Sequence, residues 1–338
     1  MGRRGRGSHN TASVGAGARD RHHHTVLRLS HKTAIIRNIS WCKMRWFTVL
    51  CVAAACTSPV RADCDGCLDG WCYTKHRLPA ESAGRTGDVD RNTNTLYVTK
   101  YPSEDRIRKC NLDTGTCNEF EVKQIRTIVV DQRTGEIYGN SFWRKGIYRF
   151  DLANNKEHLL VSDVKTWNML FKDKLYYAVA YNGGLFTYEN GVSRMGPGSK
   201  GYDVSTFVVD KNNDIYFHAS EISFAMRRLS EGVVHHDGYL ETITFPTVDK
   251  DDNVIFINYT YSDLPSTVST YVYRKINGQL VEVGAINDHT YGPPLFDRDN
   301  NLVYTFSGID PYIHLKKENA VQCVIENNKI KIRARTAP

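Results

Sequence analysis

The sequence contains six similar segments spaced by about forty residues, and this repeat narrows the possible folds more than any other feature. Each segment has two mostly apolar residues, a marker residue that is Asp in five of the six, a polar turn, and a second apolar or aromatic stretch. The markers are Asp90, Asp131, Lys172, Asp210, Asp249 and Asp297, with successive spacings of 41, 41, 38, 39 and 48 residues. Such spacing is typical of propellers and other repeat architectures.

Each repeat predicts two β-hairpins. The marker segment is expected to form a strand, a turn and a second strand, because Asp, Asn and Gly accept the backbone angles of tight turns. A second hairpin is expected after each marker, as in residues 106–122, 184–195 and 312–327. Two hairpins per repeat make a four-stranded antiparallel blade, so the sequence predicts an all-β, six-bladed propeller. A two-sheet sandwich is the alternative, but it does not require six similar units.

The first 62 residues are predicted to lie outside the propeller. Residues 1–43 are rich in Arg, Gly, Ser and His without hydrophobic periodicity, which indicates a basic disordered leader. Residues 44–62 combine a basic start, a short apolar run and a small-residue end, which is typical of a secretory signal peptide cleaved after Ala62. Whether Met44 is the true translation start stays open. A single propeller domain is then expected over residues 63–338 of a secreted protein.

Removing this segment changes the charge of the protein. The whole chain carries +7, but residues 1–62 hold eleven of the 44 Lys and Arg residues and only one of the 37 acidic residues. The remaining chain therefore has a net charge of −3, which argues against nucleic acid as a partner. No membrane partner is expected either, because the apolar run is too short to span a bilayer. Nothing in the sequence indicates an oligomeric state.

Six of the nine cysteines follow the predicted cleavage site, and an even number in an exported chain predicts disulfides. Cys110 and Cys117 flank a hairpin turn and are expected to pair with each other. The other four are Cys64, Cys67, Cys72 and Cys323. At least one of the first three must then reach Cys323 and join the two ends of the ring, although the sequence does not indicate which. A zinc site at the N-terminal cluster is less consistent with an oxidising compartment. Asn258 begins a glycosylation sequon.

Propeller geometry also predicts a ligand-binding face. Residues five before each marker should surround the opening of the central channel, and they include Arg85, Arg126 and Trp167. Neighbouring loops add aromatic residues, so the candidate binding residues are Arg85, Arg126, Trp167, Tyr291, Trp143 and Tyr181. Aromatic rings stack on planar ligands and guanidinium groups bind carboxylates, so this face is predicted to bind a planar, anionic aromatic molecule. The alternative is that these aromatic residues pack between blades.

The sequence contains no recognisable catalytic motif, such as G-x-S-x-G, H-E-x-x-H or a phosphate-binding glycine loop. The acidic turns at 249–253 and 297–301 lack the glycine and the bidentate Glu of a calcium-binding loop. The sequence therefore predicts no catalytic residues, no metal, no cofactor and no enzymatic activity.

The segment CDGCLDGWCYTK from Cys64 to Lys75, the unit DRNTNTLYV from Asp90 and the repeated V-V-D turns resemble the insect ommochrome-binding proteins. These are secreted haemolymph carriers of a tryptophan-derived pigment, and the resemblance extends over residues 63–338. It implies a non-enzymatic carrier of ommochromes or related planar aromatic acids in the haemolymph. It fixes no ligand residues, so the candidate residues above rest on propeller geometry alone.

Two other functions are compatible with a six-bladed propeller. One is a calcium-dependent lactonase or esterase, whose metal would be held by central Glu, Asn and Asp side chains. Near the predicted ring only Asn168 and Asp203 are of this kind, which disfavours this alternative. The other is an extracellular protein-binding propeller, for which the sequence shows no surface.

Overall fold

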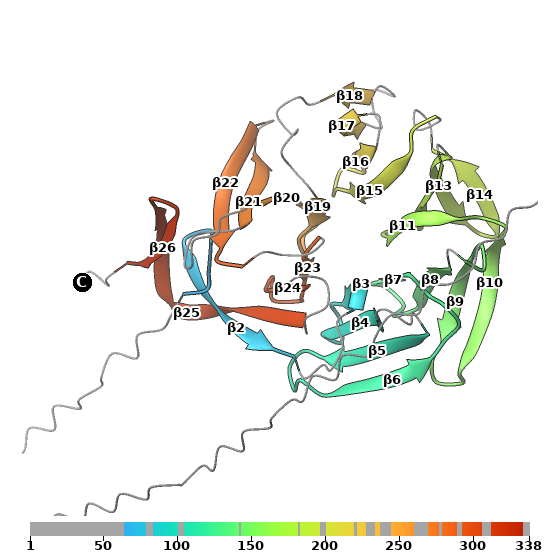
Figure 1. The fold of residues 1–338 in the computed structure, drawn as a ribbon, viewed down its shortest axis with the longest axis horizontal. Coiled ribbons are helices and arrows are strands. Elements are labelled where there is room, and N and C mark those ends of the chain that lie inside the picture. Colours follow the sequence, from blue (N-terminus) through green and yellow to red (C-terminus); the bar gives the residue numbers. More distant parts are fainter. Residues whose placement is uncertain are drawn as a thin grey trace, which may run out of the picture. The chain divides into compact units, whose positions relative to one another are not determined.

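In the computed structural model, the repeats form four-stranded antiparallel sheets arranged radially around a common centre (Figure 1). The structure describes residues 64–78, 84–100, 105–141, 143–181, 183–196, 201–219, 222–227, 234–236, 245–259, 270–276, 279–288, 293–305 and 312–333. These residues belong to one compact unit, Pro59–Pro338. The predicted leader and signal peptide lie outside the described residues. Within these ranges every regular element is a strand, and no helix is long and apolar enough to cross a membrane.

The first four blades each consist of four consecutive strands. Blade 1 contains β3 (Gly84–Asp90), β4 (Thr95–Lys100), β5 (Arg106–Asn111) and β6 (Cys117–Glu121). Blade 2 contains β7 (Thr127–Val130), β8 (Ile137–Ser141), β9 (Gly146–Asp151) and β10 (Lys156–Ser162). Blade 3 contains β11 (Thr166–Phe171), β12 (Leu175–Val179), β13 (Gly184–Glu189) and β14 (Val192–Met195). Blade 4 contains β15 (Val204–Val209), β16 (Ile215–Ala219), β17 (Ile222–Arg227) and β18 (Val234–His236).

The last two blades are joined by the N-terminal strands. Blade 5 contains β19 (Phe245–Val248), β20 (Val254–Tyr259), β21 (Thr270–Ile276) and β22 (Gln279–Ile286). Blade 6 contains β23 (Leu295–Phe296), β24 (Leu302–Thr305), β25 (Tyr312–Glu326) and, as its outermost strand, β2 (Trp71–Arg77). The short strand β1 (Gly66–Leu68) pairs with β22 on one side and β2 on the other. The prediction of six four-stranded blades is confirmed.

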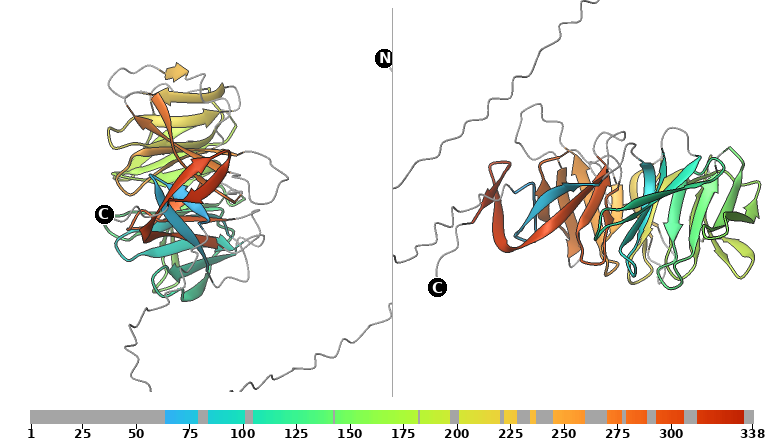
Figure 2. Two further views of the ribbon diagram at one scale, coloured as in Figure 1. Left: turned by 90° about the vertical axis from the view of Figure 1, so that its left-hand side faces the viewer. Right: turned by 90° about the horizontal axis from the view of Figure 1, so that it is seen from below.

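One hairpin prediction is wrong. Residues 312–327 were expected to supply the second hairpin of blade 6, but residues 312–326 form the single long strand β25, which pairs with β24 and β2. The hairpin to β26 (Lys329–Ile332) begins only at the end of this fifteen-residue strand and lies off the main path of the sheet. The fourth strand of this blade therefore comes from the other end of the domain, and Figure 2 shows the blue β2 beside the red β25.

Apolar side chains fill every contact between neighbouring blades. Ile107 and Ile128 share a buried cluster between blades 1 and 2, and comparable clusters lie at the other five interfaces. Tyr138 stacks on Phe171 between blades 2 and 3, with ring centroids 5.0 Å apart. The innermost strands contact one another in sequence, and β23 contacts β3. The ring is thus closed by continuous burial of apolar surface, which is the main force that stabilises such a fold.

The marker Asp residues recur in the repeats because their carboxylates stabilise the turn between the first two strands of a blade. Asp249 Oδ1 accepts hydrogen bonds from the backbone N–H groups of Asp251 and Asn253, both at 2.9 Å. The residue between them, Asp252, has a φ of 56°, a left-handed conformation that Asp and Asn tolerate better than most residues. Asp210 and Asp297 likewise accept hydrogen bonds from two backbone N–H groups of the turn that follows each of them. The marker is therefore a turn-forming residue.

Three disulfides are present among the described residues, and they are compatible with an extracellular protein. The predicted bond between Cys110 and Cys117 is confirmed, and these residues are direct cross-strand partners on β5 and β6. The predicted link between the two ends is also confirmed, because Cys67 on β1 is bonded to Cys323 on β25. Cys64 pairs with Cys72. The sequon residue Asn258 lies on β20, and its glycosylation stays a prediction.

Candidate functional site

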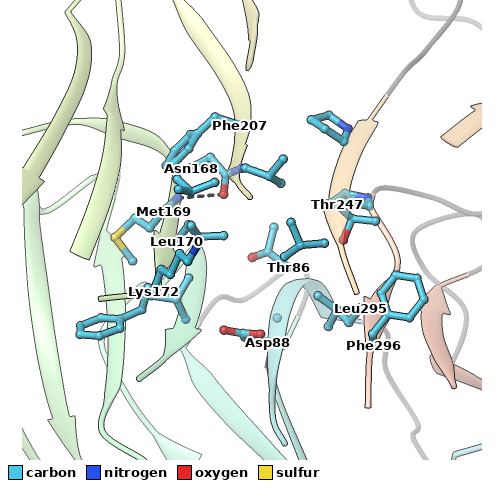
Figure 3. Close-up of a pocket in the computed structure, with 18 of the residues that line it drawn as sticks. Thr86, Asp88, Asn168, Met169, Leu170, Lys172, Phe207, Thr247, Leu295 and Phe296 are labelled. Carbon is cyan, nitrogen blue, oxygen red and sulfur yellow. Dashed lines mark hydrogen bonds between the residues drawn. The ribbon is translucent and has the colours of Figure 1, made fainter. Parts of the chain in front are cut away.

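A cavity of about 330 Å³ occupies the centre of the ring and is lined by all six innermost strands (Figure 3). Because side chains alternate along a strand, the residues four and two positions before each marker face it in layers. The first layer is mostly polar and uncharged, with Thr86, Thr127, Asn168, Thr206 and Pro293. The second layer contains Asp88, Val129, Leu170, Val208, Thr247 and Leu295. The second layer is therefore mostly apolar and includes a single carboxyl group.

Asp88 is the chemically distinctive residue of this cavity. Figure 3 shows its carboxyl group projecting into the open space, with Leu170 and Lys172 on one side and Leu295 on the other. The carboxylate accepts hydrogen bonds from the N–H groups of Val89 and Val130, each at 2.8 Å. Burial nevertheless outweighs these bonds and the nearby Arg91, and raises the pKa of Asp88 to about 6. Asp88 is thus able to exchange a proton near neutral pH.

Asp88 was not among the binding residues predicted from the sequence. The signal was present in the repeat, because the residue two before the marker is aliphatic in four blades and Thr in another. An Asp at a position that is otherwise mainly aliphatic marks a departure from the packing rule of the repeat.

The marker turns form the opposite end of the cavity from the strand starts, and we call this end the floor. Arg91, Lys172, Lys250 and Asp252 line it. Arg91 donates from Nε to the carbonyl of Phe296 and from Nη1 to the carbonyl of Lys250, both at 3.4 Å. Lys172 donates to the backbone carbonyl of Asp210, and its Nζ lies 3.6 Å from the carboxylate of Asp252. Two cations therefore reach from blades 1 and 3 toward the other side of the ring.

A second group of residues lies at the other end, where the innermost strands begin, and we call it the rim cluster: Arg126, Lys165, Trp167, Tyr181 and Asp203. The Arg126 guanidinium lies 5.2 Å from the centroid of the Trp167 ring, a cation–π contact. Trp167 meets Tyr181 edge-on at 5.7 Å, and Lys165 lies 5.6 Å from the Tyr181 ring. The cluster thus combines two aromatic rings with two cations.

Asp203 holds the two aromatic residues of the rim cluster in place. Its Oδ1 accepts hydrogen bonds from the Trp167 indole N–H at 2.9 Å and from the Tyr181 backbone N–H at 3.0 Å. Tyr181 has a φ of 62°, which is rare for a bulky residue, and its side chain is 64% exposed. Strained backbone and a large exposed ring together are characteristic of ligand-binding positions.

The structure brings together three of the six predicted binding residues: Arg126, Trp167 and Tyr181. Trp143 lies in the turn between β8 and β9 and is 69% exposed. Arg85 belongs to β3, of which only the backbone is described at this position, and Tyr291 lies outside the described residues. The predicted ring was also displaced by one residue, because Thr127 and Asn168 line the cavity whereas Arg126 and Trp167 do not.

The donor groups of the cavity do not match the calcium cage of a metal-dependent lactonase. In the part of the chain that the structure describes, no group of three or more His, Cys, Asp and Glu side chains is placed to hold a metal ion. The carboxylate of Asp88 already accepts two backbone N–H groups, and its neighbours in the same layer are mainly aliphatic. A hard divalent cation prefers six or more oxygen ligands.

No protein-family model and no curated protein matches the chain. Several solved structures are similar to the chain. A gluconolactonase from Xanthomonas campestris superposes with a TM-score of 0.57 at 13% identity, covering 75% of this chain and 96% of its own. Regucalcin, a calcium-binding protein from Agrobacterium tumefaciens, gives 0.53 at 11% identity, covering 73% and 94%. A luciferin-regenerating enzyme gives 0.53 at 12% identity, covering 74% and 97%. At such low identity these similarities establish the propeller fold.

The comparisons also correct one prediction. The protein was expected not to be an enzyme, but the propellers that it resembles include gluconolactonases and a luciferin-regenerating enzyme. That prediction is therefore contradicted. It relied on the lack of a linear motif and on the resemblance to non-enzymatic carriers. A propeller site draws its residues from different blades, so no linear motif is needed.

Proposed function

We propose that the protein is a lactonase- or esterase-type enzyme that hydrolyses small esters or lactones in the central cavity, with Asp88 as the general base. The observation that carries this proposal is a carboxyl group with a pKa of about 6 facing a cavity of about 330 Å³. A base with a pKa near the working pH is the kind that general base catalysis requires. The similarity to gluconolactonases supports the same reaction class.

The residues of the cavity suffice for the proton transfers of hydrolysis. Ionised Asp88 removes a proton from a water molecule as the water oxygen bonds to the carbonyl carbon. The carbon–oxygen bond to the alcohol then breaks, and Asp88 returns the proton to the departing oxygen. Thr206 Oγ1 accepts a hydrogen bond from Asn168 Nδ2 at 3.3 Å, which leaves the Thr206 hydroxyl proton to stabilise the negative carbonyl oxygen.

This proposal is tested with purified protein and a panel of γ- and δ-lactones and phenyl esters. Asp88→Asn should lower kcat by about 100-fold or more, the usual contribution of a general base. In the unsubstituted protein kcat/KM should rise with pH and reach half its maximum near pH 6, because only ionised Asp88 accepts a proton. Asp163→Asn, at an exposed turn position, is the matched control. Full activity of Asp88→Asn would contradict the proposal. The proposal would also be contradicted if the protein hydrolysed none of the compounds in the panel.

A second candidate function concerns the rim cluster. We propose that it binds a planar aromatic acid of the ommochrome type, with the acid on Arg126 or Lys165 and the ring system against Trp167 and Tyr181. The contacts among these residues support a site of this chemistry. This function is compatible with catalysis in the cavity, since such a molecule is either a substrate or a ligand beside it. It would place the protein in the haemolymph, as the family resemblance implies.

Fluorescence titration with xanthommatin tests this candidate. Trp167→Ala and Arg126→Ala should each weaken binding by at least tenfold while leaving the far-ultraviolet circular dichroism unchanged. Arg149→Ala, which removes an exposed arginine paired with Glu136, serves as the control. If both rim variants bound xanthommatin as tightly as the control variant, the rim cluster would not be the binding site.

A further inference from the structure

We infer that the cavity selects esters or lactones that carry a second, anionic group, and that Arg91 and Lys172 at the floor bind this group. The inference rests on the proposed hydrolysis for its substrate class, but the anion site itself can be tested by binding alone.

Arg91 lines the floor without an ion-pair partner among the described residues. Other arginines are paired with carboxylates: Arg108 with Glu119, Arg149 with Glu136 and Arg298 with Asp113. Among the residues that the structure describes, no carboxylate lies within 4.0 Å of the Arg91 guanidinium. Its two long bonds to backbone carbonyls use only part of its five N–H donors. A guanidinium group that lines a cavity and has no carboxylate within 4.0 Å is suited to bind an anion.

Lys172 is the second cation of the floor that faces the cavity. It occupies the marker position that is Asp in the other five repeats, so blade 3 alone places a cation where a turn-forming carboxylate is expected. The Lys172 side chain is only 18% exposed, and it contacts the carbonyl of Asp210 and the carboxylate of Asp252. Lys250 is paired with Asp251, so Arg91 and Lys172 carry two positive charges against the one negative charge of Asp252, and Asp88 faces them from the layer above.

The position of Asp88 sets the size of the molecule. Asp88 and Arg91 are three residues apart in one blade, so their Cα atoms are at most about 10 Å apart at 3.3 Å per residue. The long Arg side chain shortens the gap that a ligand must span. The anionic group of a substrate should therefore be only a few bonds from the bond that is broken, as in a lactone with a carboxylate on its ring.

The test compares two γ-lactones of similar size, the γ-lactone of 2-hydroxyglutarate, which carries a carboxylate, and γ-butyrolactone, which does not. The unsubstituted protein should prefer the anionic lactone in kcat/KM. Arg91→Gln should reduce this preference by about 10- to 100-fold, mainly through KM, as expected for a charge-assisted hydrogen bond. Arg298→Gln removes the arginine at the same turn position of blade 6, outside the cavity, and should leave the preference intact.

Binding of glutarate, measured by calorimetry, separates this inference from the proposed reaction. If glutarate binds, and Arg91→Gln abolishes binding, the anion site stands even if neither lactone is hydrolysed. Hydrolysis without preference for the anionic lactone, or glutarate binding that Arg91→Gln leaves unchanged, would overturn the inference. Lys172→Met provides a second variant, which removes the charge and keeps the aliphatic part of the side chain. It should also abolish glutarate binding, and unchanged binding would count against the site.

Discussion

Replacing Asp88 by Asn should stabilise the propeller at neutral pH. The pKa of Asp88 is raised from its ordinary value of 3.8 to about 6 because the ionised group is buried in a mostly apolar layer. A group with a raised pKa contributes its full stability below the unfolded pKa, and this contribution is lost as the pH rises through the folded pKa. At about 1.4 kcal/mol for each pKa unit, the loss approaches about 3 kcal/mol at pH 7.

The Asn variant avoids this loss but gives up one acceptor. Asp88 accepts two backbone N–H groups, and the single amide oxygen of Asn does this less well. We therefore expect a net gain in the free energy of unfolding of about 1 to 3 kcal/mol at pH 7, and none at pH 3.5.

Urea unfolding with the disulfides intact, at both pH values and for both proteins, measures this difference. The gain should be confined to the higher pH, because only there is Asp88 ionised in the folded protein. Parallel pH dependence of the two proteins would refute the reasoning. It would mean that Asp88 is not held in an apolar layer, and the case for Asp88 as a general base would fall with it.

Two further changes test other parts of the structure. Replacing Cys67 and Cys323 by Ser should lower the free energy of unfolding by about 5 kcal/mol, because the bond closes a loop of 256 residues; unchanged urea midpoints would contradict this. Asp203→Ala should release the Trp167 indole and the strained backbone of Tyr181, and should weaken xanthommatin binding at least tenfold with little change in the melting temperature; unaltered binding would show that Asp203 does not position these rings.

The number and composition of the blades could be predicted from the sequence because the repeat is local. Each marker turn depends on contacts within five residues, as the hydrogen bonds of Asp249 show. The lining of the cavity depends instead on which face of each strand points inward. Arg126 and Thr127 are adjacent, yet only Thr127 faces the cavity, since a shift of one residue reverses the direction of a side chain.

Other features could not be predicted because they depend on residues far apart in the sequence. The pairing of β2 with β25 joins segments more than two hundred residues apart, and β2 carries no marker. The pKa of Asp88 depends on apolar residues from several other blades, so the sequence shows an unusual Asp but not its environment. The rim cluster was partly predicted because Arg126 and Trp167 occupy equivalent positions in successive repeats.

The use of β2 as the outer strand of blade 6 has a consequence for how the protein is made. Synthesis proceeds at about 5 to 20 residues per second, so β2 waits for about ten to fifty seconds before its partner β25 is complete. During this time blades 1 to 5 can form only an open arc. Five of the six cysteines that form the described disulfides have also emerged by then, and Cys67 is the one whose partner, Cys323, comes last. Correct pairing therefore requires that Cys67 stay free, or be released from a wrong partner, until the segment that contains Cys323 has been made.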